Sequence, residues 1–194
     1  KRIAYSTVSQ VSYILFGLTL LTPEGVTGAL LHLVAHALAK SCLFLGAGIV
    51  IYFTLPDSNY HYVDQLRGVG KELPVTLICF GLASLSLVGL PPTGGFVSKW
   101  FLGVGALRPQ LDRMGTAGLI VLLVSAALTA GYLLPIVTAA FFPGRDYDYT
   151  RQFPPSPPAN MRAPLVLLAA AAVLTGVFAG PLVRYFERFA AGIL

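Results

Sequence analysis

Apolar runs long enough to cross a bilayer are the feature that most restricts the fold of this 194-residue chain. A membrane-spanning helix needs roughly 20 consecutive apolar residues, and most of the runs reach or exceed that length. The predicted spans are Ile3–Leu21, Val26–Phe53, Leu73–Leu107, Gly115–Phe142 and Leu165–Phe178, the last extended by Pro181–Val183. Membrane β-strands have about 9–11 residues and alternate in polarity, which these runs do not. We therefore predict an all-α, polytopic membrane protein with about five transmembrane helices, one of them broken.

The composition agrees with a membrane protein and excludes several other classes. Hydrophobic residues make up 56% of the chain and charged residues 11%, with a mean hydropathy of +0.76, which is typical of helical membrane proteins. The net charge of +5 includes no dense basic run, so we expect no nucleic-acid partner. The sequence has no Gly-rich phosphate loop, catalytic-triad spacing or metal-ligand cluster, so we predict no catalytic residues, no cofactor and no metal. Cys42 and Cys79 lie in apolar runs and are predicted to be unreactive buried thiols.

Charged and proline-rich segments divide the chain into three predicted parts. Residues 1–142 form the main membrane domain, 143–164 a Pro-rich loop too polar to span, and 165–194 a final transmembrane helix with an amphipathic tail. Cations concentrate in cytoplasmic loops of membrane proteins. The two predicted sides carry Lys1, Arg2, Arg67, Lys71, Arg145, Arg151 and Arg162 against Arg108, Arg113, Arg184 and Arg188. We therefore expect the N-terminal side in the cytoplasm and the C-terminus outside it.

Two lysines lie inside the apolar runs, Lys40 near the middle of the second run and Lys99 in the third. A charged amine at the centre of a membrane helix costs a few kcal/mol on insertion scales, so its presence indicates a function. All carboxylates lie in loops or the tail: Glu24, Asp57, Asp64, Glu72, Asp112, Asp146, Asp148 and Glu187. None of them is available to pair with either lysine at membrane depth. Because a low-dielectric site disfavours a charged amine, both lysines are candidates to release and regain a proton in a relay.

Two histidines share a helix face with Lys40. His32, His36 and Lys40 recur every four residues, so successive side chains lie about 6 Å apart along one face. Imidazoles titrate near neutral pH and pass protons between their two nitrogens, which predicts a stripe of proton carriers. Two alternatives stay open. The histidines could be hydrogen-bonded core residues, or the pair could hold zinc, although no glutamate follows the first histidine as in a metalloprotease helix.

A Pro-Pro-Thr-Gly-Gly segment interrupts the third run just before Lys99. As one helix this run would be about 52 Å long, well beyond the roughly 30 Å hydrocarbon core. Pro91 and Pro92 remove two backbone donors and so free the carbonyls four residues before each of them. Gly94 and Gly95 relax the chain, which predicts a hinge. A broken membrane helix is tolerated where the break lines a water-filled cavity, so we expect water beside Lys99. The alternative is a simple kink with Lys99 reaching toward the membrane surface.

Three segments resemble consecutive motifs of one superfamily: KRIAYSTVSQVSYILFGL, HLVAHALAKSCLFLGAG and GLPPTGGFVSKW. They look like motifs of the antiporter-like membrane subunits shared by NADH:quinone oxidoreductase (complex I), Mrp-type cation/proton antiporters and membrane-bound hydrogenases. The resemblance covers roughly residues 1–140. It implies a fourteen-helix fold of two inverted repeats, of which this chain would be the C-terminal part. It also implies a central relay role for Lys40, preceded by His32 and His36, and an exit-side role for Lys99 on the broken helix.

The resemblance further implies partners and a location. We expect other membrane subunits of a multisubunit complex as partners, protons as the transported ion with Na⁺ as a second candidate, and a prokaryotic inner membrane. The first and third motifs look closest to the D-type proteins of Mrp complexes, which favours a monovalent cation/proton antiporter. One alternative is a proton-pumping subunit of NADH:quinone oxidoreductase or of a membrane-bound hydrogenase. The other is a structural subunit that conducts no protons, with the lysines binding lipid headgroups or a neighbouring subunit.

Overall fold

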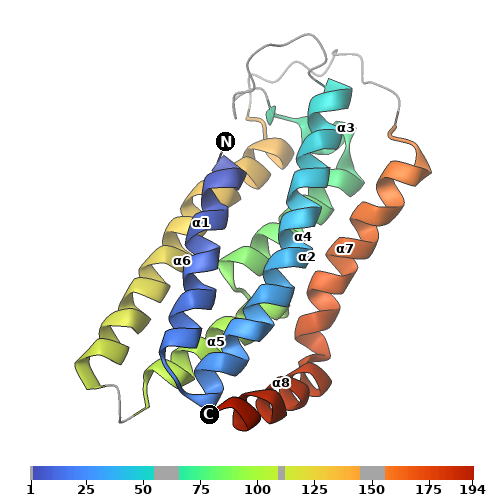
Figure 1. Ribbon diagram of the computed structural model, residues 1–194. Helices are drawn as coiled ribbons and strands as arrows, with labels where there is room; N and C mark the ends of the chain where they lie inside the picture. Colours follow the sequence, from blue (N-terminus) through green and yellow to red (C-terminus); the bar gives the residue numbers. More distant parts are fainter. Residues whose placement is uncertain (1, 55–65, 109–111, 145–155) are drawn as a thin grey trace.

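The computed structural model describes residues 2–54, 66–108, 112–144 and 156–194, and this part of the chain is helical with no strand. The elements are α1 (Arg2–Thr19), α2 (Pro23–Thr54), α3 (Val69–Glu72), α4 (Pro74–Val88), α5 (Gly94–Ala106), α6 (Asp112–Phe141), α7 (Ala159–Val177) and α8 (Ala179–Ile193). The long helices run alongside one another, and α8 lies across one end of the bundle (Figure 1). The predicted all-α fold with one broken helix is confirmed.

The predicted spans correspond to these helices, with two differences near the C-terminus. The helix α7 begins at Ala159, six residues before the predicted start at Leu165. Pro158 is its N-cap, and Pro164 lies inside the helix, in its second turn. The Pro-rich loop therefore ends before residue 159. The amphipathic tail is a separate helix, α8, because the chain leaves helical geometry at Phe178. The predicted loop residues 55–65 and 145–155, and Lys1, lie outside the described residues.

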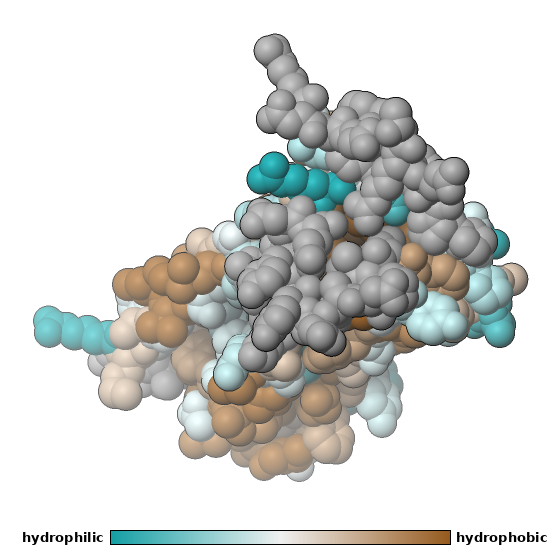
Figure 2. Space-filling view, turned by 90° about the horizontal axis from the view of Figure 1, so that it is seen from above, coloured by the Kyte–Doolittle hydropathy of each residue, from teal (hydrophilic) through white to brown (hydrophobic). Residues whose placement is uncertain are grey.

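Three segments within the described helices are candidates to cross a membrane. Pro23–Phe53, Arg113–Phe141 and Ala159–Val177 are long and apolar enough to cross a membrane by length and composition. The third predicted span is divided between α4 and α5, and α4 is apolar but short. Large apolar side chains are exposed on the flanks of the bundle, which Figure 2 shows in brown. Such extended apolar surface is unusual in a soluble monomer and fits a lipid-facing exterior.

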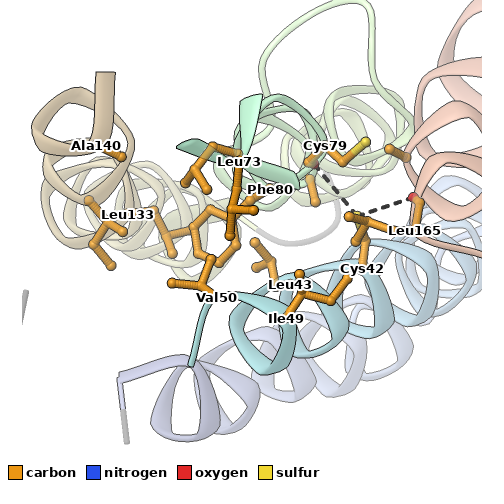
Figure 3. Close-up of a cluster of buried hydrophobic side chains, with 14 of the residues drawn as sticks. Cys42, Leu43, Ile49, Val50, Leu73, Cys79, Phe80, Leu133, Ala140 and Leu165 are labelled. Atoms are coloured by element: carbon orange, nitrogen blue, oxygen red, sulfur yellow. Dashed lines mark hydrogen bonds between the residues drawn. The ribbon is translucent and has the colours of Figure 1, made fainter. Parts of the chain in front are cut away.

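The helix α2 is the centre of the bundle and packs against α1, α4, α5, α7 and α8. The main hydrophobic core joins α2 to α4, α6 and α7, with Leu43, Phe80 and Leu133 among its buried members (Figure 3). Cys42 lies in this core and its Sγ contacts the carbonyl oxygens of Cys79 (3.6 Å) and Leu165 (3.8 Å). Both cysteines are free and buried, as predicted.

Glycines bring α2 and α5 into close backbone contact. A Cβ added at Gly28 of α2 would lie 2.7 Å from the backbone nitrogen of Leu102 in α5, and one added at Gly105 would lie 2.6 Å from the nitrogen of Gly25. Small residues allow such close approach between membrane helices, where packing replaces the hydrophobic effect as the driving force. Since α2 carries Lys40 and α5 carries Lys99, this crossing fixes the two lysine-bearing helices against each other.

Candidate functional site

Lys99 lies in the second turn of α5 and reaches back across the break to the end of α4. Its Nζ donates hydrogen bonds to the carbonyl oxygens of Leu87 (2.7 Å) and Val88 (2.8 Å). These are the two carbonyls that the prolines were predicted to free, and the ammonium group itself caps them. A cation at this position also interacts favourably with the negative end of the α4 dipole. The side chain is only 8% exposed, so the alternative in which Lys99 reaches the membrane surface is wrong.

Gly89 makes room for this lysine. It ends α4 in the left-handed conformation (φ +90°), and its amide donates to the carbonyl oxygen of Leu85 at 2.9 Å. A Cβ at Gly89 would lie 2.7 Å from Cδ of Lys99. A glycine here therefore serves both the backbone turn and the passage of the lysine side chain.

The Pro-Pro-Thr-Gly-Gly segment is a closely packed joint. Pro91 and Pro92 lie within the break between α4 and α5, and Gly94 and Gly95 begin α5. A Cβ at Gly95 would lie 1.8 Å from the carbonyl oxygen of Ser86, and one at Gly94 would lie 2.5 Å from Thr175 Oγ1 in α7. A side chain at either position would collide with these atoms, so close packing alone explains both glycines. The hinge function that we assigned to this segment stays a prediction.

Lys40 is buried in the middle of α2, 5% exposed, and contacts the beginning of α1. Its Nζ donates to the carbonyl oxygen of Ile3 at 2.5 Å and to Ser6 Oγ. Neither partner carries a charge. Like Lys99, Lys40 is therefore held by neutral oxygen atoms, which stabilise an ammonium group without neutralising it by an opposite charge.

His32 connects three helices through its two ring nitrogens. Its Nδ1 lies 2.9 Å from Ser98 Oγ in α5, and its Nε2 lies 3.1 Å from Gln10 Oε1 in α1. The Ser98 hydroxyl also lies 2.9 Å from the carbonyl oxygen of Gly95. If Ser98 donates to that carbonyl, Nδ1 of His32 donates to Ser98. If Ser98 donates to Nδ1 instead, the proton of a neutral imidazole lies on Nε2 and is donated to Gln10. The Gln10 Nε2 atom has no partner among the described residues, so the amide is free to turn and donate to His32 in the first case, and a neutral His32 satisfies both contacts either way.

His36 lies between His32 and Lys40 on the same helix face, as the spacing predicted. The rings of His32 and His36 are stacked with centroids 6.3 Å apart. The Nε2 atom of His36 is buried and has no hydrogen-bond partner among the described residues. Within that same part of the chain, no group of three or more His, Cys, Asp or Glu residues could hold a metal. Among the described residues, the hydrogen bonds that leave Ser98 thus continue from His32 to Gln10 in α1 and do not reach His36.

Sequence reasoning missed the contribution of α1. Tyr13 presents its ring to Lys99, with Nζ 5.0 Å from the ring centroid, and meets His32 edge to face at 5.4 Å. Ser6, Gln10 and Tyr13 follow one another at i, i+4 and i+7, which places them on one helix face. This polar stripe within the predicted span Ile3–Leu21 is the signal that could have identified them.

Residues 1–131 match the family described as NADH:quinone oxidoreductase/Mrp antiporter, TM. Among individual proteins, NADH-quinone oxidoreductase subunit N of Desulforudis audaxviator is 36% identical over 188 residues, covering 92% of this chain and 36% of the relative. The chain therefore spans about a third of the length of that relative.

Two solved structures share the fold over nearly the whole chain. The Mrp complex from Dietzia sp. has a chain that superposes with a TM-score of 0.81 at 24% identity, covering 98% of this chain and 42% of that one. Respiratory complex I from Thermus thermophilus gives a TM-score of 0.81 at 23% identity, with 98% and 38% covered. At these identities the likeness concerns the fold.

Proposed function

The chain belongs to the NADH:quinone oxidoreductase/Mrp antiporter transmembrane family, and on that premise we propose that it carries protons through the membrane by way of Lys40 and Lys99. The observation that carries the proposal is the pair of buried amines whose hydrogen bonds, among the described residues, go to carbonyl and hydroxyl oxygens and to no carboxylate. A carboxylate partner would lock the charged form of an amine in place, whereas neutral partners leave the proton exchangeable. His32 and His36 are the groups between the two lysines that are able to pass a proton.

The proposal is tested by two substitutions of Lys40 in the assembled membrane complex, reconstituted in vesicles with a pH-sensitive dye inside. Lys40→Met removes the titratable group and should abolish most proton transport. Lys40→Arg keeps a positive charge, yet it should fail as well, because a guanidinium group does not release its proton at physiological pH. Transport at the unsubstituted rate in the arginine variant would contradict a relay role for Lys40.

A structural role predicts the opposite result for the methionine variants. If the lysines only bind lipid headgroups or a neighbouring subunit, Lys40→Met and Lys99→Met should leave transport intact in a correctly assembled complex. A relay predicts that both variants lose it. His32→Ala and His36→Ala should each be milder than either lysine variant, because internal water is able to bridge the position of one missing imidazole.

The parent complex has two candidates. The motif wording favoured an Mrp-type cation/proton antiporter, whereas the fold favours neither candidate, because chains of an Mrp complex and of complex I superpose on it equally well. The 36% identity to an NADH-quinone oxidoreductase subunit supports a proton-pumping oxidoreductase instead. Sodium dependence separates them: an antiporter should move Na⁺ against protons in vesicles without any electron donor, and a pumping oxidoreductase should require NADH or another reductant.

The protein is an integral membrane protein, and we place its N-terminal side in the cytoplasm. The start of α1, the short helix α3 and the start of α7 gather at one end of the bundle, while the α1–α2 turn and α8 lie at the other (Figure 1). The cation count compared two groups of loops that were predicted to lie on opposite sides of the membrane. The arrangement of the helices supports that grouping. A single cysteine introduced at Lys71 should be shielded from an impermeant thiol reagent in intact cells and should react after lysis, and the reverse pattern would invert the orientation.

A further inference from the structure

The last turn of α7 packs directly against the break between α4 and α5. A Cβ added at Gly176 would overlap the carbonyl of Pro92 and the carbonyl carbon of Thr93, and it would lie 2.7 Å from the backbone nitrogen of Gly94. All of these are backbone atoms of the break or of the first residue of α5. Thr175 approaches the same segment, since its Oγ1 atom lies 2.5 Å from the position of a Cβ on Gly94. We call Thr175 and Gly176 the α7 brace.

The contact leaves no room for a side chain at Gly176. Its neighbours are backbone atoms, which cannot turn aside as the end of a flexible side chain does. The break is also held from within, because Thr93 is only 1% exposed and its hydroxyl donates to the carbonyl oxygen of Leu90 at 2.7 Å. A side chain at Gly176 would therefore displace the backbone of the break as a unit.

The brace acts on the stretch of chain that the Lys99 side chain bridges. Lys99 lies in the second turn of α5, and its Nζ bonds the carbonyl oxygens of Leu87 and Val88 at the end of α4. These bonds form only while the end of α4 and the start of α5 keep their separation and angle. Gly95 fixes the joint between these two helices through its contact with Ser86, and the brace fixes it from α7.

Ordinary core packing is the alternative explanation, and the place of the contact argues against it. The residues of α7 in the main hydrophobic core are Met161, Leu165, Leu168 and Ala169, all in the first two-thirds of the helix. The last turn contacts the break instead. This part of α7 also lies outside the residues 1–131 that match the family.

We propose that Gly176 is a positioning residue for Lys99, which keeps the break in the place where the amine reaches the end of α4. This inference rests on the proposed function, because the position of Lys99 affects transport only if Lys99 carries protons. Gly176 itself bears no titratable group and acts through the backbone of the break. A side chain there moves the start of α5 away from α7, and Lys99 loses at least one of its two carbonyl partners.

The test compares Gly176→Ala with Gly131→Ala in the assembled complex, reconstituted in vesicles with a pH-sensitive dye inside. Both glycines lie within helices, but a Cβ at Gly131 meets nothing within 4 Å. Gly176→Ala should lower proton transport about tenfold, the factor that corresponds to one hydrogen bond to a charged group. Gly131→Ala should transport at the unsubstituted rate. Equal transport in the two variants would overturn the proposal.

The pH profile of transport separates positioning from a loss of folded protein. A variant that only folds or assembles poorly lowers transport by the same factor at every pH, so the shape of its profile is kept. The carbonyl oxygens of Leu87 and Val88 stabilise the charged form of Lys99. Their loss should therefore change the pH of half-maximal transport in Gly176→Ala and leave it unchanged in Gly131→Ala. A lower rate with an unchanged profile would reduce Gly176 to a packing role and refute the proposal.

A second variant loosens the brace without adding a clash. The Thr175 hydroxyl donates to the carbonyl oxygen of Ala172 in its own helix at 3.1 Å, so Thr175→Ala removes a contact with the break and no described hydrogen bond between helices. Transport should fall about threefold with the same change of pH profile. Thr138→Ala on the exposed side of α6 is the matched control, because its hydroxyl also bonds a carbonyl of its own helix, that of Pro135. If Gly176→Ala does not assemble, a Thr175→Ala protein that behaves like Thr138→Ala overturns the proposal.

Lys99→Met in the same assay separates failure of the brace from failure of the proposed function. If Lys99→Met stops transport while Gly176→Ala behaves like Gly131→Ala, the positioning role is wrong and the lysine relay stands. If Lys99→Met transports normally, Lys99 carries no protons, and both the relay through Lys99 and the positioning role of Gly176 are wrong.

Discussion

The close contact between α2 and α5 makes a quantitative prediction at Gly28. Gly28→Ala would place a methyl group 2.7 Å from the backbone nitrogen of Leu102, and backbone cannot move aside as a flexible side chain does. Overpacking of this kind costs about 1–3 kcal/mol. Alanine also gains about 1 kcal/mol over glycine in a helix interior. The net effect on the free energy of unfolding should therefore be a loss of about 0–2 kcal/mol.

Gly48 is the matched control in the same helix, because a Cβ there meets nothing within 4 Å. Gly48→Ala gains the helix propensity without the clash, so the difference between the two variants isolates the packing cost of about 1–3 kcal/mol. For a chain of this size each kcal/mol shifts Tm by about 2–4 °C. Thermal unfolding in detergent should show Gly28→Ala melting about 2–12 °C below Gly48→Ala. A Gly28→Ala protein that melts at or above the Gly48→Ala protein would refute the close crossing.

Three further predictions follow from contacts around the break and at the end of the bundle. Gly89→Ala should lower proton transport and the free energy of unfolding, the latter by about 1–2 kcal/mol from the left-handed backbone alone, as measured by dye quenching and thermal melting. Replacing Pro91 and Pro92 together by alanine should reduce transport in an assembled complex, because a closing helix would take the carbonyls that Lys99 caps; unchanged transport would contradict this. Glu24→Gln, which removes the exposed ion pair with Arg108, should change the free energy of unfolding by less than about 1 kcal/mol, and the change should shrink further in high salt.

The break before Lys99 shows how far the sequence alone could go. Proline chemistry identified which carbonyls would be free, and the buried lysine at helical distance from them was visible as well. The sequence did not show that the lysine itself takes those carbonyls, because this depends on how α5 turns relative to α4. That turn is set by Gly89 and by the contact of Gly95 with Ser86, and both involve distances across the fold that local patterns do not encode.

The polar stripe of α1 was missed for a different reason. Serine, glutamine and tyrosine in an apolar run carry no charge, so they cost little in a membrane and stand out less than two lysines do. Ser6 and Tyr13 became informative only when packing placed α1 against α2 and α6. The start of α7 was also misplaced, because the loop was predicted to extend to Pro164, whereas the helix begins at Ala159 and includes this proline.

The glycine crossing of α2 and α5 has a mechanical consequence for the two lysines. Helices whose backbones are in contact have little room to slide past one another at the crossing, so we expect the spacing between Lys40 and Lys99 to change little when the protein works. A signal that passes between them must then travel as a change of electric field or of water orientation, with little displacement of the scaffold. A protein with such a crossing should work at nearly the same rate in thin and thick bilayers, whereas a protein that rocks its helices would respond to membrane thickness.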